Sequence, residues 1–272
     1  MLTDAHCHPY YLTRVFPEAE EELKRLHVLC AASSTGLEEF AYNEDLSRRA
    51  AGILPCFAIH PQLPASKKHV TEGELERGLE AMESLAAQGR LAAVGETGFD
   101  LYNAAFKETE AVQDRLFATH LETALQHDLP VIIHARRAMH KVFALTKTLT
   151  KCRAVIFHSW SGTLEEGYAL LRRGVNAYFS FGAVIMLNHK QAMRCAALFP
   201  QDRLLAETDA PYQPPRAQEF SHWTDLSRII ETMAALRRED AEGKHAASPC
   251  SDTGELEEQI EENFRAAFRL RP

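Results

Sequence analysis

The chain has 272 residues, of which 46% are hydrophobic and 25% charged, and its formal net charge is −8 at pH 7. These proportions are those of an ordinary globular protein, so they exclude a disordered chain, a collagen or a coiled coil as a description of the whole. An acidic protein can still bind nucleic acid, but only through a local basic patch or metal ions, because its overall field repels phosphates.

The six cysteines form no CxxC pair, and Cys7, Cys30 and Cys56 lie in apolar runs. This pattern indicates a reducing compartment rather than a disulfide framework. The first residues, MLTDAHCH, lack the basic and apolar regions of a secretory signal, and no apolar stretch approaches the ~20 residues that span a bilayer. We therefore expect a cytoplasmic protein with no membrane partner.

Short apolar runs alternate with helix-like segments along the whole chain. The runs that we interpret as strands are Leu2–His6, Val28–Ser33, Ile53–His60, Leu91–Glu96, Pro130–His134, Ala154–His158, Asn176–Phe181 and Arg203–Glu207. They are apolar on both faces, as parallel strands covered on both sides are. Eight such units predict an α/β fold, a single-domain TIM-type (β/α)8 barrel over residues 1–272. A doubly wound open sheet is the alternative, but no GxGxxG motif follows the first run.

One polar segment interrupts this alternation near the end of the chain. Residues 237–254, RREDAEGKHAASPCSDTG, contain few large apolar side chains. We expect them to form a mobile surface insertion between a helix around Thr224–Leu236 and a terminal helix over Glu255–Phe268.

Polar side chains gather where the predicted strands end, which is where barrel enzymes place their chemistry. Two histidines two residues apart end the first run, so their side chains face the same way and can chelate one cation. Two more histidines and two carboxylates follow at the ends of other runs. Burying so many polar groups at one rim is costly without a cation. The predicted metal ligands are His6, His8, Glu96, His134, His158 and Asp209.

Six ligands exceed the needs of one tetrahedral ion but suit two ions roughly 3.5–4 Å apart. Glu96 is the natural bridge, because a carboxylate has two oxygens. We expect His6, His8 and Asp209 to hold one ion, and His134 with His158 to hold the other. Nitrogen and oxygen ligands without a thiolate indicate Mg²⁺, Mn²⁺ or Zn²⁺, and the sequence does not choose among them.

Asp209 and Glu96 are the candidate catalytic residues, with Asp209 placed to take a proton from the attacking water. Glu207 is expected to orient a histidine ligand. Arg136 is a candidate phosphate clamp, and Arg137 and Lys141 would extend that basic edge. The other predicted substrate-binding residues are Trp160 as a base-stacking platform, His60 and Tyr212. A solvated arginine and a packed aromatic ring are the ordinary structural alternatives.

Taken in order, these motifs resemble those of the TatD family of metal-dependent hydrolases, within the amidohydrolase-like barrel superfamily. The matching stretches are DAHCH at 4–8, AIHP at 58–61, VGETGFD at 94–100, LPVIIHARRA at 129–138, VIFHSWSG at 155–162 and AETDAPY at 206–212. The resemblance implies a barrel, two divalent ions on the six ligands named above, and phosphodiester hydrolysis, typically as a 3′–5′ exodeoxyribonuclease with DNA as substrate.

The chain departs from the family pattern at several positions. Thr97 and Phe99 stand where aliphatic residues are usual, Ser159 and Trp160 replace a common Cys-Phe pair, and the usual Asn-Glu-Pro segment is absent. None of these changes removes a ligand, but they bear on substrate preference. Two other functions remain open: a metal-dependent amide or ester hydrolase, including one that deacylates aminoacyl-tRNA, and a barrel that binds metal without turnover. The sequence also leaves the oligomeric state open.

Overall fold

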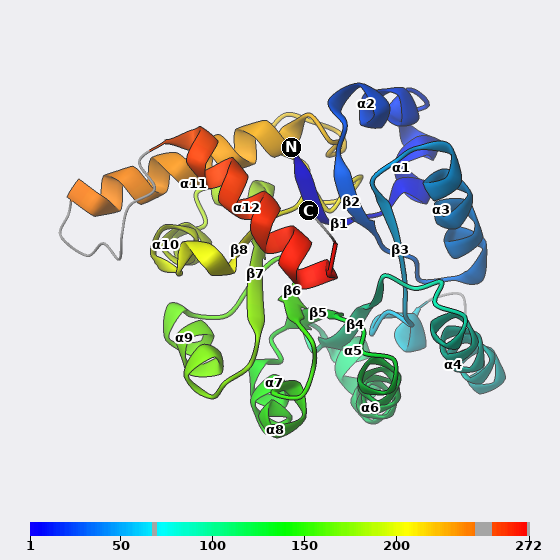
Figure 1. The fold of residues 1–272 in the computed structure, drawn as a ribbon. Helices are drawn as coiled ribbons and strands as arrows, with labels where there is room; N and C mark the ends of the chain where they lie inside the picture. Colours follow the sequence, from blue (N-terminus) through cyan, green and yellow to red (C-terminus); the bar gives the residue numbers. More distant parts are fainter. Residues whose placement is uncertain (67–69, 243–251, 271–272) are drawn as a thin grey trace.

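Eight parallel strands lie side by side in chain order in the computed structural model, which describes residues 1–66, 70–242 and 252–270 (Figure 1). Each strand pairs with the next one along the chain, as the predicted barrel requires. The α/β barrel prediction is therefore confirmed. The strands are β1 (Thr3–Cys7), β2 (Leu29–Ala32), β3 (Ile53–Phe57), β4 (Ala93–Asp100), β5 (Val131–Arg136), β6 (Val155–Phe157), β7 (Ala177–Phe181) and β8 (Leu204–Ala206).

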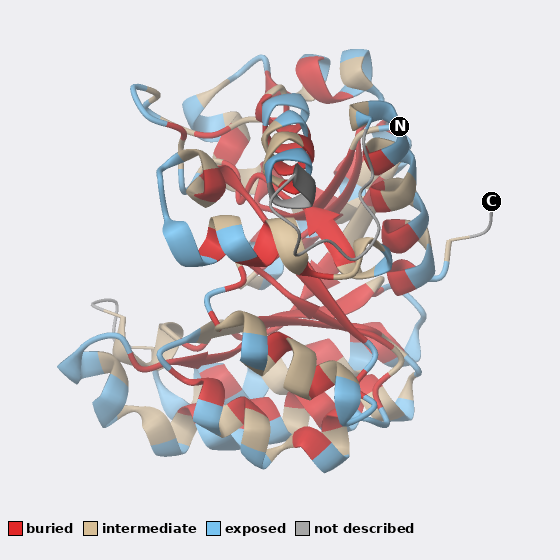
Figure 2. Ribbon diagram, turned by 90° about the vertical axis from the view of Figure 1, so that its left-hand side faces the viewer, coloured by how far each residue is buried: buried red, intermediate tan, exposed pale blue. Residues whose placement is uncertain are grey.

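Helices follow the strands and cover the outside of the barrel. In Figure 2 the strands run through the interior as buried ribbon, with helices on either side whose outer faces are exposed. Sequence signals fix several helix starts: Thr71 and Thr163 each form a capping box with the glutamate three residues later. The principal helices are α1 (Pro9–Val15), α2 (Ala19–Leu26), α3 (Leu37–Arg49), α4 (Glu72–Ala87), α5 (Ala104–Glu108), α6 (Glu110–Gln126), α7 (Met139–Ala144), α8 (Thr146–Leu149), α9 (Leu164–Arg172), α10 (Lys190–Leu198), α11 (Asp225–Glu242) and α12 (Thr253–Phe268).

Hydrogen bonds just beyond the last strand join β8 to β1. The backbone N–H of Asp209 donates to the carbonyl of His6 (2.9 Å), and that of His8 donates to the carbonyl of Ala210 (2.7 Å). The carboxylate of Asp4 in β1 accepts from the backbone N–H of Thr208 (2.9 Å). The first and last predicted ligand segments are therefore fixed to each other.

Helix α12 closes the barrel at the amino ends of its strands, and it crosses the front of the barrel in Figure 1. Phe264 and Phe268 pack against inward-facing residues near the strand starts, among them Ala5, Ile132 and Leu205. The side-chain amide of Asn263 donates to the carbonyls of Gln201 (2.7 Å) and Leu204 (2.8 Å), which holds the helix in place. The carboxyl ends of the strands are thus the open end of the barrel.

The predicted insertion at 237–254 includes residues at both ends that belong to helices. Residues 237–242 continue α11, and Thr253 already belongs to α12. The expected mobile segment is thereby reduced to 243–251, which lies outside the described residues, so its mobility stays a prediction. Over the part of the chain that the structure describes, we find no helix with the length and hydrophobicity needed to cross a membrane.

Candidate metal centre

Glu96 lies at the centre of the open end of the barrel and is 3% exposed. Its Oε2 faces His6, which lies in β1, and His8, which follows that strand. That oxygen is 3.2 Å from His6 Nε2 and 3.8 Å from His8 Nε2. Both imidazoles also approach Asp209 Oδ1, at 3.4 and 3.5 Å. His6, His8 and Asp209 therefore form one group whose ligand atoms lie within 4.8 Å of one another.

The other carboxylate oxygen of Glu96 faces a second set of imidazoles. Its Oε1 is 2.8 Å from His134 Nδ1, 3.3 Å from His60 Nε2 and 3.6 Å from His158 Nε2. His60, Glu96 and His134 form a group of potential ligands, and His158 groups with Glu96 and His6. The two oxygens of this one carboxylate thus point toward two different sets of nitrogen donors.

His60 belongs to this second set, although sequence analysis assigned it to substrate binding. It follows β3, where the backbone N–H of Ile59 donates to Nε2 of the buried His120 (3.3 Å). That bond fixes the chain just before His60. The AIHP motif carried the signal, since His60 ends a predicted strand as the other candidate ligands do.

Asp100 is a site residue that sequence analysis missed. Strand β4 runs four residues beyond its predicted end, so Glu96 and Asp100 lie on the same face of one strand. Asp100 Oδ2 lies 3.1 Å from His134 Nε2 and accepts from the side-chain amide of Gln62 (2.7 Å). His134 is therefore held between two carboxylates. The alternation of Glu96, Gly98 and Asp100 in VGETGFD was the available signal.

Buried polar groups behind the cluster orient its imidazoles. Glu207 Oε1 lies 3.1 Å from His158 Nδ1 and also accepts from the backbone N–H of Ser159 (2.8 Å). Ser33, at the end of the second predicted strand, places its Oγ 3.0 Å from His6 Nδ1. These neighbours face one nitrogen of each ring, and the other nitrogen, Nε2, faces Glu96.

The carboxylates of the cluster are ionised at neutral pH. Burial opposes the charged form of Glu96, but His60, His6 and His158 outweigh burial and hold its pKa well below the usual range. Asp209 is also buried, and its histidine neighbours likewise keep its pKa below the ordinary value. The site therefore offers a cation two negative charges in a buried setting.

Two of the histidines respond in opposite ways to the same environment. Burial would lower the pKa of His134, but its hydrogen bonds to Asp100 and Glu96 raise that pKa to about 9. For His60 burial dominates, and its pKa lies below the usual histidine value. His60 is therefore neutral near pH 7, whereas His134 has to release a proton to bind a cation.

The donor set fits divalent cations of the Mg²⁺, Mn²⁺ or Zn²⁺ type, because it contains imidazole nitrogens and carboxylate oxygens. Cys7 stands between the two ligand histidines of DAHCH but contributes no sulfur to the site. Successive side chains of a strand alternate sides, and its thiol donates instead to the carbonyl of Ala31 (3.7 Å).

A pocket of about 510 Å³ opens directly above the cluster. Arg136 and Tyr212, which the sequence predicts to bind substrate, line this pocket, and so does Tyr11. The ring of Tyr212, 47% exposed, lies 5.3 Å from that of His8 and 6.2 Å from that of Tyr11. Two aromatic rings therefore stand beside the cluster at the rim of the pocket.

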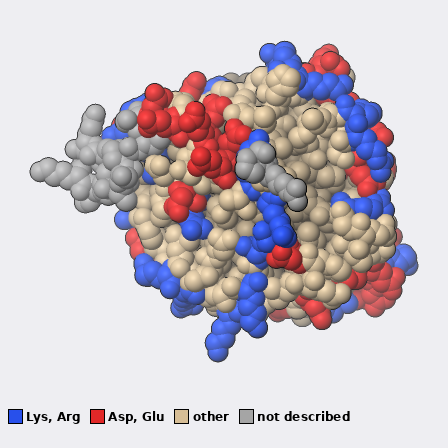
Figure 3. Space-filling model, viewed as in Figure 1, with Lys and Arg blue, Asp and Glu red and all other residues tan. Residues whose placement is uncertain are grey.

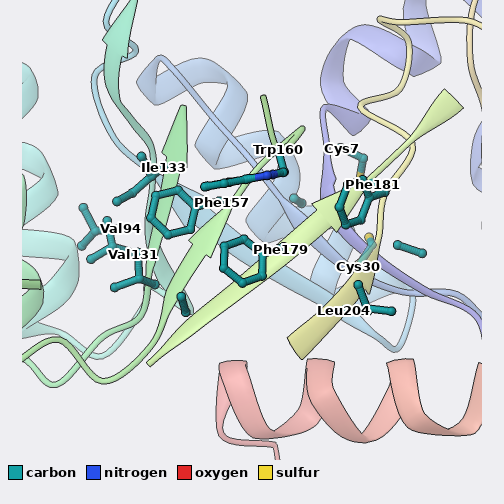
Figure 4. Packing of buried hydrophobic residues seen from close by; sticks show 14 of the residues in the cluster. Cys7, Cys30, Val94, Val131, Ile133, Phe157, Trp160, Phe179, Phe181 and Leu204 are labelled. Atoms are coloured by element: carbon teal, nitrogen blue, oxygen red, sulfur yellow. The ribbon is translucent and has the colours of Figure 1, made fainter. Parts of the chain in front are cut away.

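Trp160 does not stand at this rim, and the prediction of a base-stacking platform there is wrong. Its side chain is 3% exposed, with ring centroids 4.7 Å from Phe179 and 5.2 Å from Phe157. Figure 4 shows the indole lying among these phenylalanines. Gly162 permits this packing, because a Cβ there would lie 2.5 Å from the indole Cζ2.

Lys141 does not extend the basic edge, contrary to the expectation from sequence. Its Nζ lies 2.9 Å from Glu110 Oε1 and 2.7 Å from Asp114 Oδ1, both on α6. Its charge is satisfied by these two carboxylates. Of the three basic residues predicted for this edge, only Arg136 lines the pocket above the cluster.

A parallel barrel with histidines and carboxylates converging at its carboxyl ends has the architecture of a metal-dependent hydrolase. The family described as TatD related DNase matches residues 3–269. The chain belongs to this family.

Individual relatives agree with that assignment. The chain is 29% identical over 216 residues to a Shigella flexneri protein named 3′-5′ ssDNA/RNA exonuclease TatD, covering 77% of this chain and 80% of the relative. It is also 29% identical over 248 residues to the Escherichia coli K12 protein named uncharacterized metal-dependent hydrolase YcfH, covering 87% and 88%. The crystal structure of YJJV, a TatD homolog from E. coli K12, superposes with a TM-score of 0.83 at 22% identity, covering 99% of this chain and 98% of that one.

Proposed function

We propose that this chain is a two-metal phosphodiesterase that acts on single-stranded nucleic acid as a 3′–5′ exonuclease. The observation that carries the proposal is the placement of Glu96, whose two carboxylate oxygens face two separate sets of imidazoles. A carboxylate so placed suits a bridge between two cations. The relative named as an ssDNA/RNA exonuclease supports nucleic acid as the substrate class.

In this proposal Glu96 is shared between two donor sets. His6, His8 and Asp209 would hold one divalent ion, as the sequence predicts. The second ion would be held by the three histidines that face Glu96 Oε1: His60, His134 and His158. The sequence predicts only the last two of these. Divalent cations in such a site lower the pKa of water and polarise phosphoryl oxygens.

Asp209 is proposed as the proton acceptor for the attacking water. It lies in the left-handed region (φ 55°) just after β8, where Asp is among the few residues tolerated. Its Oδ2 accepts from the side-chain amide of Gln213 (2.7 Å), which holds the carboxylate in one orientation. The water oxygen bonds to phosphorus, a P–O ester bond breaks, and the leaving oxygen takes a proton from solvent.

The distribution of charge supports approach of the substrate at the open end. Arg136 supplies a guanidinium at the pocket, which suits bidentate contact with a phosphate. On the opposite face, shown in Figure 3, acidic side chains gather over the first half of α12, which carries Glu255, Glu258 and Glu262. That acidic patch repels a polyanion.

The test is hydrolysis by purified protein in Mg²⁺, Mn²⁺ or Zn²⁺ of three substrates: single-stranded DNA with either end labelled, a cyclic amide and a carboxylic ester. We expect loss of nucleotides from the 3′ end and no turnover of the amide or ester. Turnover of the amide or ester alone, or no turnover with any metal, would overturn the proposal.

Two variants test the roles of the carboxylates. Glu96→Ala removes the shared ligand, so we expect it to fold, to lose bound metal by elemental analysis and to lose most of its activity. Asp209→Asn keeps the shape of the side chain but not its basicity. We expect it to retain at least one metal, with turnover reduced by about 10²–10⁴-fold. Near-full turnover by either variant contradicts the role assigned to that residue.

A further inference from the structure

A second pocket adjoins the one above the metal cluster and also measures about 510 Å³. Arg136 and Ser161 line both pockets, so the two are contiguous. Tyr102, Arg137 and His140 line only the second. Nothing in the two-metal reaction requires this second space.

The ring of Tyr102 contacts two guanidinium groups. The guanidinium carbon of Arg136 lies 3.6 Å from the centre of that ring and that of Arg137 lies 4.5 Å from it. Arg137 Nη1 also donates to the backbone carbonyl of Tyr102 (3.3 Å). These contacts hold both cations against one aromatic ring at an exposed position.

Within the described ranges, no carboxylate lies within ion-pair distance of either guanidinium. Glu166 also lines the second pocket, but its carboxylate accepts from the backbone N–H of Thr163 (2.7 Å) in the capping box of α9. Other basic side chains nearby do have partners, as Lys141 does with Glu110 and Asp114. In a chain of net charge −8, two adjacent arginines without a carboxylate partner indicate that an anion is bound from outside.

We propose that the second pocket is a subsite for the phosphodiester next to the one being cleaved. The inference rests on the proposed function, since it assigns the substrate one more nucleotide in a fixed place. Arg137 contacts only this second phosphate, whereas Arg136, at the junction of the pockets, faces both phosphates. Tyr102 acts as a positioning residue that keeps the two guanidinium groups turned toward the pocket.

The test compares thymidine oligomers that differ by one phosphate. The dinucleotide TpT has one phosphodiester, and the trinucleotide TpTpT has two. For the native protein we expect kcat/KM to be about tenfold higher for TpTpT, as one charge-assisted phosphate contact provides. Arg137→Ala should abolish this difference and leave kcat/KM for TpT within about twofold of the native value. Arg136→Ala should slow cleavage of both substrates.

Arg173→Ala is the matched control. Arg173 also lies over an aromatic ring, that of Phe143 at 4.9 Å, but it lines neither pocket. This variant should behave as the native protein with both substrates. If Arg137→Ala lowers cleavage of TpT and TpTpT equally, or lowers neither, the subsite is refuted while the nuclease function stands.

Binding supplies a readout that does not depend on catalysis. The anisotropy of fluorescein-labelled hexathymidylate, measured with EDTA present, should show about tenfold weaker binding to Arg137→Ala than to the native protein. The slope of log K against log salt should also fall in magnitude by about 0.7, the value for one phosphate of a single strand. If the native protein cleaves neither oligomer, the proposed function fails, and this binding difference still decides whether the subsite exists; equal binding by both proteins refutes it.

Discussion

His120 makes the stability of this barrel sensitive to mild acid. The imidazole is fully buried, its Nε2 accepts from the backbone N–H of Ile59 (3.3 Å), and its Nδ1 contacts the hydroxyl of Thr97. Burial lowers its pKa from 6.5 to about 3, so the folded protein keeps it neutral where the unfolded chain protonates it. Its contribution to stability is complete above pH 6.5 and is lost as the pH falls below that value.

The size of the effect follows from that difference. At pH 5 the unfolded histidine lies about 1.5 pH units below its pKa, and each unit corresponds to about 1.36 kcal/mol, so the folded state loses about 2 kcal/mol relative to pH 7.5. His120→Gln keeps an acceptor for Ile59 but does not titrate. In urea unfolding at both pH values, the native protein should lose about 2 kcal/mol more than this variant.

His27→Asn serves as the control, because His27 is an exposed histidine in the left-handed region at the end of α2. It should follow the native protein at both pH values. If the native protein and His120→Gln lose stability in parallel between pH 7.5 and 5, then His120 is not the acid-sensitive group and burial does not lower its pKa.

Three further changes test the metal centre and the packing around it. Adding a divalent metal at about 1,000 times its Kd to protein stripped of metal should stabilise the native chain by about 4 kcal/mol in thermal unfolding. The same addition should not stabilise Glu96→Ala. An equal stabilisation of both proteins would mean that the metal binds elsewhere. Phe264→Ala, at a fully buried ring of α12, should cost about 3–5 kcal/mol in urea unfolding, and a cost under about 1 kcal/mol would mean that α12 does not seal the barrel. Gly162→Ala should displace the indole of Trp160, lower the free energy of unfolding by about 1–3 kcal/mol and alter the tryptophan fluorescence. An unchanged spectrum would contradict the close packing of Trp160 against Gly162.

The fold was predictable because each strand is a short apolar run of similar character. Hydrophobic periodicity depends only on residues close in the sequence, so β1 and β8 could be predicted without knowing that they are neighbours in the barrel. The residues at which strands end were harder to predict. The pairing of β4 with β5 extends to Asp100 and Arg136, and this extension depends on a neighbouring strand that the local pattern of β4 does not reveal.

The convergence of the candidate ligands was predictable from topology alone, since the carboxyl ends of parallel strands meet at one rim. The sequence did not predict which histidines face each carboxylate oxygen of Glu96, because that depends on the direction of each side chain. His60 ends a predicted strand as His134 does, but only the structure places its Nε2 3.3 Å from Glu96 Oε1. The orientation of an imidazole also depends on residues far away in the sequence, as that of His6 does on Ser33.

Trp160 shows why residue type alone misleads at a rim. It follows His158 by two residues, and an aromatic side chain there suits a nucleic-acid enzyme. Ser159 instead adopts a left-handed turn, with φ 44°, and the indole that follows packs against Phe179 of β7 and Phe199 at the end of α10. The space for this indole exists because Gly162 and the surrounding phenylalanines leave room for it, which no local pattern reveals.

The helix that seals the amino ends of the strands determines how any long substrate must move. Because Phe264 and Phe268 fill that end, the barrel is closed at one end and no channel passes through it. A strand end that enters must withdraw by the same mouth, and the released fragment leaves past the chain that remains. Repeated cutting of one molecule therefore requires the polymer to retreat or shift sideways after each cut, since it cannot thread through the centre.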